Sequence, residues 1–414
     1  MSDFTFVDCN GLAGFMSYGF VQSGMKMVER TGTLDFGNRV AEANRSLLGN
    51  DWTSFFSDEP SDWPVHNADV VVGCPPCSGW SVWSIGNRGP DAKAHEHTRA
   101  FMRYAAIVKP KVIIFECVQQ AFTQGREVMA KYRDMVEDLS GKEYDLYHVK
   151  MNNLQIGGFS YRARYFWVAV ERGMKFGAFA EAPKDLPTVN EIIGDLEPLE
   201  LMWEQQPYSQ THLPSKYVES LVSATGAVGG HQNKNNLESQ RIAEIFDILG
   251  NDGWKPMMSI DIALKNAVEK NGDKFPQSWQ FNEEKLRAKN FNMGFSIPCR
   301  WNGESYCHVL TGGALDHVIH PNLQRRITHR EAARIQGLPD DWEFASVKDY
   351  SMLSATWGKA VSAQAGRWIA DATKSALEGQ PSGPSGELIG DREYLIDTDK
   401  GFTRHFVKKN WYNA

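Results

Sequence analysis

The stretch DVVVGCPPCSGWS, residues 69–81, decides the fold. A short apolar run ends there in a turn that contains two prolines and two cysteines. Such a run, bounded by turn residues, is typical of a buried strand. Cys77 should therefore lie just beyond the carboxyl end of a strand, where ligands bind in open α/β sheets. The two prolines restrict the backbone and so orient the Cys77 side chain. Such orientation benefits a catalytic nucleophile, whereas a buried structural cysteine does not need it.

Apolar runs and helical patterns alternate around this stretch in the N-terminal part of the chain. Strands are predicted at Thr5–Asp8, Val70–Gly73, Val112–Glu116 and Tyr165–Val170. Helices are predicted at Thr98–Val108 and Arg126–Leu139, where apolar residues recur three and four positions apart. This alternation predicts an α/β fold with a doubly wound, Rossmann-like parallel sheet.

The pattern changes in the middle of the chain. From about Met174 to Leu323 the sequence is rich in Pro, Gly, Asn and aromatic residues and has no sustained period. We therefore expect a smaller, irregular domain at 174–323 and a catalytic domain built from 1–173 and 324–378. The stretch GQPSGPSGE predicts that 379–414 form a linker and a C-terminal tail.

A helical signal resumes in the segment THREAARIQGLP. Thr328 can cap this helix, and Glu331, three residues on, can complete a capping box. Gly337 and Pro339 should end it. A second helix is predicted at about Ala360–Leu377, and both helices belong to the part of the chain that we expect to rejoin the catalytic domain.

The composition is that of an ordinary folded protein, with 42% hydrophobic and 23% charged residues among 414. A net charge of −7 argues against a general nucleic-acid coat protein, because such proteins rely on clustered Lys and Arg. Any contact with DNA must therefore be local. Two basic segments, Glu283–Asn290 and Asn322–Arg330, are candidates, although such segments are also common on ordinary surfaces.

Neither a long apolar run nor a basic leader is visible, so we expect a cytoplasmic protein with no membrane partner. Six cysteines in so long a chain do not resemble a secreted disulfide framework. Cys74 and Cys77 also fit a redox CxxC pair, and a loose group of Cys299, Cys307 and His308 could be considered for zinc. We favour a catalytic thiol and predict no metal.

A second strand-end residue, Glu116, lies in the run KPKVIIFECVQQ. The carboxyl ends of parallel strands meet at one edge of a sheet, so Cys77 and Glu116 are expected to face one pocket.

Six short motifs then occur in the order of one known family. They are NGLAGF at 10–15, GCPPCSGWS at 73–81, FECV at 115–118, YRARYFWV at 161–168, IHPNLQRRITHREAARIQGLPDDW at 319–342 and GKAV at 358–361. Together they resemble the cytosine carbon-5 DNA methyltransferases. The resemblance spans about Phe4–Ala370 and leaves the middle domain and the tail without a recognisable pattern.

The resemblance implies the chemistry of that family. The thiolate of Cys77 would add to carbon 6 of a cytosine that has been flipped out of double-stranded DNA, while Glu116 contacts ring nitrogen 3. Arg164 would contact the base, and Arg162 would support the site. The alkyl group would come from S-adenosyl-L-methionine.

The resemblance also implies a cofactor site. Its residues would be Asn10, Gly11, Leu12, Gly14, Pro76, Lys359, Ala360 and Val361. Asp58 would accept a hydrogen bond from the adenine amino group and Asp35 would hold the ribose hydroxyls, with Glu29 as the rival of Asp35. Residues 174–323 correspond to the target-recognition domain of the family.

Four residues depart from the family pattern, namely Cys9, Cys117, Ser160 and Lys359. Lys359 replaces an Asn that the resemblance places beside the sulfonium. An ammonium 4 Å from a sulfonium is unfavourable by about 4 kcal/mol at an effective dielectric of 20. A carboxylate on the transferred group would offset this, which predicts carboxy-S-adenosyl-L-methionine as the donor and 5-carboxymethylcytosine as the product. Otherwise Lys359 turns outward to a phosphate or acid, or loses its proton on burial.

Two other functions remain open at this point. A catalytically inactive DNA-binding homologue would tolerate altered cofactor motifs, although it would not need the reactive Cys77. An RNA cytosine methyltransferase would keep the chemistry, but the long middle domain favours duplex DNA. We expect a bacterial cell or a phage-infected one. The sequence leaves open the DNA target, the oligomeric state and the biological role, whether restriction-modification, phage genome modification or regulation.

Overall fold

A computed structural model describes residues 4–32, 35–57, 60–77, 79–80, 89, 95–181, 183–196, 237–256, 258–271, 299–311, 318–323, 326–343 and 356–402. The chain forms two compact units, Met1–Asp185 with Ala360–Asn413, and Leu186–Lys359. The sequence placed the corresponding boundaries after residues 173 and 323. The assignment of the units to catalysis and target recognition stays a prediction.

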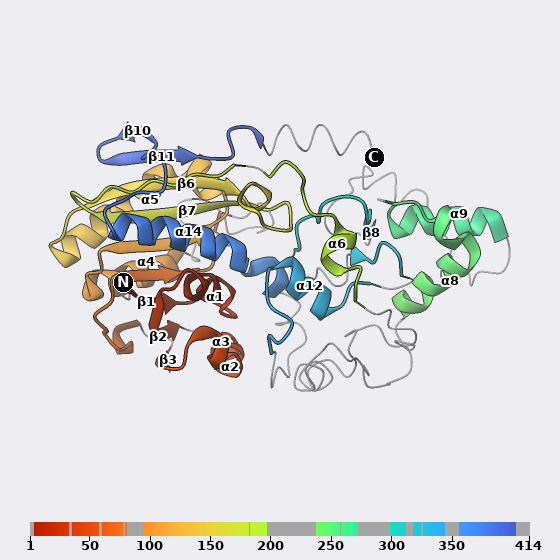
Figure 1. Ribbon diagram of the computed structural model, residues 1–414, viewed down its shortest axis with the longest axis horizontal. Coiled ribbons are helices and arrows are strands. Elements are labelled where there is room, and N and C mark those ends of the chain that lie inside the picture. The colour runs from red at the N-terminus through yellow and green to blue at the C-terminus, as the bar shows by residue number, and fades with distance from the viewer. Residues whose placement is uncertain are drawn as a thin grey trace. The chain divides into compact units, whose positions relative to one another are not determined.

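A nine-stranded sheet lies at the centre of the first unit, in the order β10-β11-β6-β7-β5-β4-β1-β2-β3 (Figure 1). The strands are β1 (Thr5–Cys9), β2 (Lys26–Gly32), β3 (Thr53–Phe56), β4 (Val70–Gly73), β5 (Val112–Cys117), β6 (Tyr144–Asn152), β7 (Ala163–Glu171), β10 (Glu387–Gly390) and β11 (Glu393–Asp397). The four predicted strands are confirmed as β1, β4, β5 and β7. However, β7 runs antiparallel to β5 and β6, which corrects the expectation of a purely parallel sheet.

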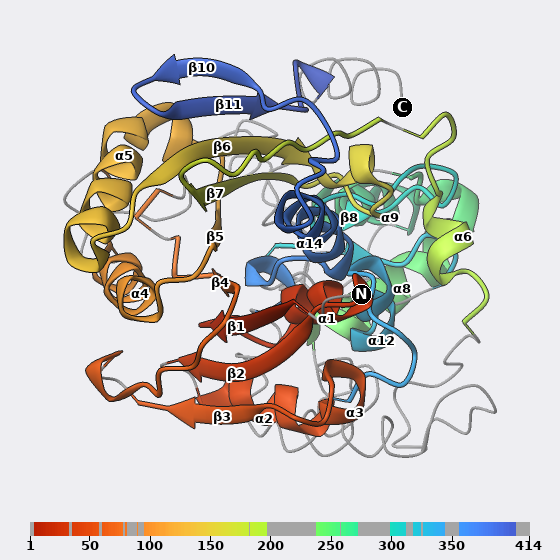
Figure 2. The same cartoon turned by 60° about the vertical axis from the view of Figure 1, so that its left-hand side comes forward.

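Helices cover both faces of this sheet, as Figure 2 shows. One face carries α4 (His95–Val108) and α5 (Gln120–Ser140), which contain the two helices predicted there. The other carries α1 (Phe15–Gln22) and α14 (Ala363–Leu377), and the latter corresponds to the helix predicted at about Ala360–Leu377. The short helices α2 (Asp35–Ala43) and α3 (Arg45–Leu48) link β2 to β3, and the 3₁₀ turns η1 (Pro60–Asp62) and η2 (Asn153–Ile156) precede β4 and follow β6. The doubly wound α/β fold is therefore confirmed.

Two glycines bring α1 and α14 into close contact. A Cβ on Gly19 would come within 2.3 Å of the Ala363 carbonyl oxygen, and one on Gly366 within 2.5 Å of the Met16 carbonyl oxygen. Only glycine leaves room for backbones this close. The C-terminal helix is thus fixed against the N-terminal one.

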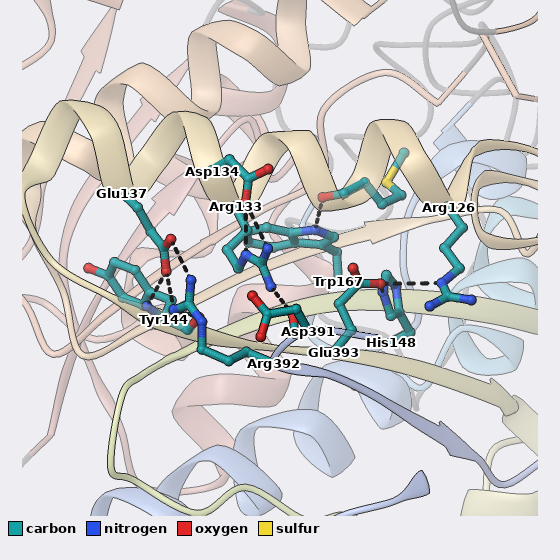
Figure 3. Close-up of polar contacts among 11 residues, drawn as sticks. Arg126, Arg133, Asp134, Glu137, Tyr144, His148, Trp167, Asp391, Arg392 and Glu393 are labelled. Atoms are coloured by element: carbon teal, nitrogen blue, oxygen red, sulfur yellow. Dashed lines mark hydrogen bonds and ion pairs between the residues drawn. The ribbon is translucent and has the colours of Figure 1, made fainter. Parts of the chain in front are cut away.

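The hairpin of β10 and β11 extends the sheet beyond β6 (Figure 2), and Figure 3 shows the polar side chains that join it to α5. Arg392 donates to both carboxylate oxygens of Glu137 on α5, at 2.7 and 2.9 Å. Arg133, also on α5, donates to the Asp391 carbonyl oxygen at 2.6 Å. The expectation that 379–414 are only a linker and tail therefore needs correction, because Glu387–Gly390 and Glu393–Asp397 form strands of the sheet.

The second unit contains α6 (Val189–Ile193), α8 (Leu237–Gly253), α9 (Ile260–Asn271), β8 (Cys299–Arg300), β9 (Val318–Ile319) and α12 (His329–Ile335). α8 and α9 pack around a core that includes Phe246 and the fully buried Trp254. The expectation of irregular structure across 174–323 thus needs correction at 237–271. Gly250, with a φ of 69°, interrupts α8. The stretch in which apolar residues recur at helical spacing is therefore short, and the sequence indicates this helix only weakly.

The predicted capping box of α12 is present. Thr328 Oγ1 accepts from the Glu331 amide at 3.2 Å, and Glu331 accepts from the Thr328 amide at 2.7 Å. The helix ends before Gly337, whose φ of 77° lies in the left-handed region. Across the described parts of both units, no helix is long and apolar enough to cross a membrane.

Candidate active site

Cys77 and Glu116 lie near the carboxyl ends of neighbouring strands. β4 ends at Gly73, which pairs with Phe115 of β5, so Glu116 is the next residue along β5. A Cβ at Gly73 would come within 2.5 Å of the Cys9 carbonyl oxygen on β1. Glycine therefore lets the chain leave the crowded sheet and enter the Pro-Pro-Cys turn.

Glu116 is buried and is held by two side chains. Arg164 of β7 places its Nε 2.5 Å from Glu116 Oε1. The Cys74 thiol donates to Glu116 Oε2 at 3.4 Å. Because both partners come from other segments of the chain, the carboxyl group is fixed at the edge of the sheet next to the Pro-Pro-Cys turn.

The half-buried Cys77 is the thiol best suited to ionise. Its pKa is lowered, first because Cys117 donates a hydrogen bond to its sulfur and further because Arg164 and Arg162 lie near it. Burial and the charge of Glu116 act in the opposite direction. A lowered pKa increases the fraction of thiolate, the form that attacks carbon.

The two neighbouring thiols behave differently. Burial raises the pKa of both Cys74 and Cys117. All three cysteines are free rather than joined in a disulfide. Cys74 and Cys117 therefore stay protonated at neutral pH and can donate hydrogen bonds, while Cys77 can accept one.

Arg162 links the site to the closing motif of the chain. It is buried, and its Nη2 donates to the Ala360 carbonyl oxygen at 2.9 Å. Burial and the nearby Arg164 lower its pKa to about 9. Next to Ala360 and the buried Val361, Ser362 donates to Asn153 at 2.8 Å. The first residues after Lys359 are thus held against the end of β6.

A tryptophan fixes the segment that follows Cys77. The Trp80 amide donates to the Cys77 carbonyl oxygen at 3.0 Å, and the Trp80 ring lies 4.7 Å from the ring of His95. The Trp80 ring also packs on Gly125, where α5 has non-helical dihedral angles. A Cβ on Gly125 would come within 2.3 Å of the ring. The geometry after Cys77 therefore depends on a glycine of α5.

The predicted cofactor loop follows β1 and is tightly folded. Asn10, Leu12 and Gly14 have positive φ values of 59°, 45° and 82°. A Cβ on Gly11 would come within 2.0 Å of the buried Asp8 carboxylate. Glycine is thus required at position 11 by the carboxylate on which the loop rests, a reason that the sequence did not suggest.

Asp8 itself is paired on one side only. Its Oδ2 accepts from Ser17 at 2.5 Å and from the buried Arg30, which also donates to the Leu12 carbonyl oxygen. Within the described residues, Asp8 Oδ1 is buried and has no hydrogen-bond partner. A donor group bound at this loop could supply one.

The remaining predicted cofactor residues differ in burial, and the structure does not describe all of them. Pro76 and Lys359 are both exposed. The suggestion that Lys359 loses its proton because it is buried is therefore wrong. Glu29 is fully buried in the middle of β2, where it accepts from Thr53 and lies 3.0 Å from His66 Nε2. Glu29 therefore lies inside the sheet, three residues before the end of β2, and its role as the rival of Asp35 stays a prediction. The side chain of Asp35, and all of Asp58, lie outside the described residues.

Two other hypotheses from the sequence concern basic segments that could contact DNA and a possible zinc site. Arg326 and Arg330 of the segment Asn322–Arg330 are buried, so these two arginines do not form the open basic surface that was considered, while Arg325 lies outside the described residues. The segment Glu283–Asn290 lies outside the described residues. Over the described ranges, no group of three or more His, Cys, Asp or Glu side chains is placed to hold a metal ion, the loose group of Cys299, Cys307 and His308 included.

A family model described as C-5 cytosine-specific DNA methylase matches residues 4–375. The chain belongs to this family. Membership implies a methyltransferase that acts on DNA and uses S-adenosylmethionine.

Individual relatives are distant. The type II methyltransferase M.XorII of Xanthomonas oryzae pv. oryzae is 25% identical over 343 residues, which cover 79% of this chain and 73% of the relative. The type II methyltransferase M.DdeI of Desulfomicrobium norvegicum is 22% identical over 351 residues, or 81% and 78% of the two chains. Among solved structures, a candidate DNA modification methyltransferase encoded within an E. coli prophage has a TM-score of 0.57 at 19% identity, covering 91% of this chain and 99% of its own. That likeness supports the fold.

Sequence reasoning missed two contributors to the site. Cys117 was noted only as a departure from the family pattern, because its effect on the pKa of Cys77 acts between β5 and the turn after β4 and no local pattern reveals it. Gly125 lies one residue before the helix predicted at Arg126–Leu139 and was not singled out, because the sequence did not show that α5 begins as early as Gln120.

Proposed function

We propose that this methyltransferase alkylates carbon 5 of cytosines in duplex DNA through a transient covalent bond between Cys77 and carbon 6. The observation that carries the proposal is a thiol of lowered pKa beside a buried, arginine-paired carboxyl group at the carboxyl edge of the sheet. A stacked cytosine is out of reach of a thiol at the end of a strand, so the base must be extruded from the duplex.

Each site residue has a role in this chemistry. The Cys77 thiolate adds to carbon 6, which makes carbon 5 electron-rich enough to be alkylated. Glu116 contacts ring nitrogen 3 and favours that addition by hydrogen bonding or proton transfer. Arg164 holds Glu116 in place and contacts the base, while Arg162 supports the site through the Ala360 carbonyl oxygen. Loss of the carbon-5 proton and departure of Cys77 then restore the ring.

The loop after β1 suits S-adenosylmethionine. Asn10, Gly11, Leu12 and Gly14 would hold it, and the unpartnered Oδ1 of Asp8 is a buried acceptor beside this loop. Pro76, Ala360 and Val361 would complete the site, with Asp35 at the ribose and Asp58 at the adenine. When bound, this cofactor supplies an electrophilic alkyl carbon.

A second donor is favoured by one residue. Lys359 is exposed and immediately precedes Ala360, which Arg162 contacts. An ammonium near a sulfonium calls for a compensating anion, which the carboxylate of carboxy-S-adenosylmethionine would provide. In this variant of the proposal the enzyme produces 5-carboxymethylcytosine, and Lys359 selects the donor.

Covalent trapping tests the central step. The enzyme is incubated with S-adenosylmethionine and random-sequence duplexes that contain 5-fluorocytosine, from which the carbon-5 fluorine cannot be removed. We expect a denaturation-resistant adduct on the peptide that contains Cys77, and none with Cys77→Ser. Cys299→Ser, which removes a thiol of the second unit, should react like the wild type. No adduct with the wild-type enzyme would contradict the proposal and point to an inactive DNA-binding homologue.

Mass analysis of released nucleosides identifies both the nucleic acid and the transferred group. Unmodified genomic DNA and transfer RNA are each treated with either cofactor. We expect modified cytosine in DNA only, and 5-carboxymethylcytosine when the carboxylated cofactor is supplied. Lys359→Asn should shift the product toward 5-methylcytosine. Methylcytosine alone under all conditions would reject the carboxymethyl variant, and product in RNA alone would reject DNA as the substrate.

A further inference from the structure

The loop of residues 10–14, which follows β1, has an unusual backbone. Asn10 and Leu12 have positive φ values of 59° and 45°, although neither is glycine. Residues with a Cβ rarely adopt this region, because the Cβ then crowds the following carbonyl oxygen. Such a conformation persists only where the surrounding structure fixes it. The contacts of the loop therefore show what holds it in this form.

Arg30 of β2 connects this loop to its neighbours, and its side chain is buried. Its Nη2 donates to the Leu12 carbonyl oxygen, and its Nη1 donates to Asp8 of β1, which lies opposite Arg30 in the register of the two strands. Its Nε donates to Asn38 Oδ1 on α2 at 3.1 Å. Ser17 of α1 donates to Asp8 at 2.5 Å and so fixes the carboxylate as well. A single guanidinium thus ties the loop to β1, β2 and α2.

Two glycines restrict the loop further. A Cβ on Gly11 would come within 2.0 Å of the Asp8 carboxylate, and one on Gly37 of α2 would come within 1.9 Å of the Leu12 carbonyl oxygen. The carboxylate and the carbonyl group therefore both lie directly against backbone. A different path of the loop would have to break the contact between Arg30 and Leu12.

We propose that Arg30, paired with Asp8, is a positioning residue of the cofactor site, which holds the Leu12 carbonyl oxygen and thereby keeps the loop in the conformation that binds S-adenosylmethionine. This inference rests on the proposed function in so far as this loop holds the cofactor. Replacing a buried ion pair by apolar side chains of similar size often costs no stability, so stability alone does not explain the pair. Arginine suits the task because its planar fork donates to several acceptors at once, whereas lysine offers a compact point charge.

Loss of the pair should weaken cofactor binding in a protein that still folds. Removing one partner alone would leave a buried, unpaired charge, so the main variant is Asp8→Leu with Arg30→Met, which removes both charges and fills the space with apolar groups. The loop can then leave its positive-φ conformation, and the apparent Kd rises as the binding-competent fraction falls. We expect an increase of at least roughly tenfold. Arg30→Lys keeps a charge beside Asp8 but does not reach all three acceptors, so it should fold and raise the Kd in the same direction.

Calorimetric titration of the free enzyme with S-adenosylhomocysteine measures this Kd without DNA or turnover. S-adenosylhomocysteine is the by-product of either donor, so the result does not depend on which group is transferred. Hydrogen exchange of the peptide that spans residues 9–15 gives a second readout, and it should become faster in the double variant while β4 stays protected. The matched control, Glu137→Leu with Arg392→Met, removes an ion pair at the C-terminal hairpin and should change neither the Kd nor the exchange of the loop.

The outcomes separate this inference from the proposed function. If the wild-type enzyme binds S-adenosylhomocysteine, an unchanged Kd in the folded double variant and in Arg30→Lys would overturn the inference, and so would an equal loss of affinity in the control. If the wild-type enzyme does not bind it, the proposed cofactor site is rejected, and faster loop exchange in the double variant would then show only that the pair holds the loop.

Discussion

Gly125 shows how one absent side chain can position a distant one. Gly125 lies on α5, and the ring of Trp80 occupies the space where a Cβ of Gly125 would be. Trp80 follows Cys77 by three residues. Trp80 in turn donates its amide hydrogen to the Cys77 carbonyl oxygen. A change on the helix should therefore reach the nucleophile through two contacts.

Gly125→Ala tests this dependence. Alanine normally favours a helix over glycine by about 1 kcal/mol, but here its Cβ would displace the Trp80 ring, and overpacking of this kind is unfavourable by about 1–3 kcal/mol. We expect a lower melting temperature and an adduct rate at least about tenfold lower, in line with the sensitivity of catalysis to small displacements. Gly141→Ala, at the open end of α5, should leave the adduct rate unchanged. A faster or unaltered Gly125→Ala enzyme would show that Trp80 does not position Cys77.

At the scale of elements, charged side chains join the C-terminal hairpin to α5 and β6, in addition to the pairing of β11 with β6. Figure 3 shows Arg126, Arg133 and Glu137 of α5 directed toward the hairpin. His148 of β6 lies 3.3 Å from Glu393 and 2.7 Å from the Tyr165 hydroxyl. The contacts with the hairpin join residues more than 200 positions apart in the sequence, so they make the hairpin part of the sheet rather than a tail.

The Arg392–Glu137 pair should contribute measurably to stability. Its side chains are 22% and 16% exposed, and the contact is bidentate. We expect Arg392→Ala to lower the free energy of unfolding by about 1–3 kcal/mol, because the partner carboxylate is left partly buried and unpaired. The matched control is Arg172→Ala, since the Arg172–Glu143 pair is 57% and 59% exposed and should contribute less than about 1 kcal/mol. Equal losses in urea unfolding would contradict this ranking.

The elements differ in how far they can be predicted from sequence. β4 and β5 are continuous apolar runs, VVVG and VIIFEC, and such strands are visible without their neighbours. β2 and β11 read KMVERTG and EYLID, and their charged residues are satisfied only by partners that the fold supplies. The same holds at the site. The strand-end positions of Cys77 and Glu116 follow from local pattern. The contacts of Arg164 with Glu116 and of Arg162 with the Ala360 carbonyl oxygen depend on how distant parts of the chain come together.

On the scale of the whole molecule, buried histidines in both units should lower the free energy of unfolding at acidic pH. Burial lowers the pKa of His148 in the first unit, and it lowers the pKa of His308 in the second to about 4. In the unfolded chain a histidine has its ordinary pKa of about 6.5. The unfolded state therefore binds more protons below that pH, so the free energy of unfolding falls as the pH is lowered.

Urea unfolding at pH 7, 6 and 5 checks this expectation. His308 alone should remove about 2 kcal/mol between pH 7 and pH 5, given unfolded and folded pKa values of about 6.5 and 4. His308→Asn should flatten part of the profile. His97→Gln, which changes an exposed histidine on α4, should retain the wild-type slope. If the His308→Asn slope equals that of the wild type, the histidine is not buried in its neutral form.

The contact between α1 and α14 also has a consequence for biosynthesis. A ribosome releases the N-terminal residues first, but the surface of α1 that includes Gly19 is covered by a helix that begins only at Ala363. Until translation has passed that point, the nascent chain exposes the α1 surface that α14 later covers, and such intermediates are prone to aggregate. The protein should therefore need protection by chaperones during most of its synthesis and become active only near the end of translation.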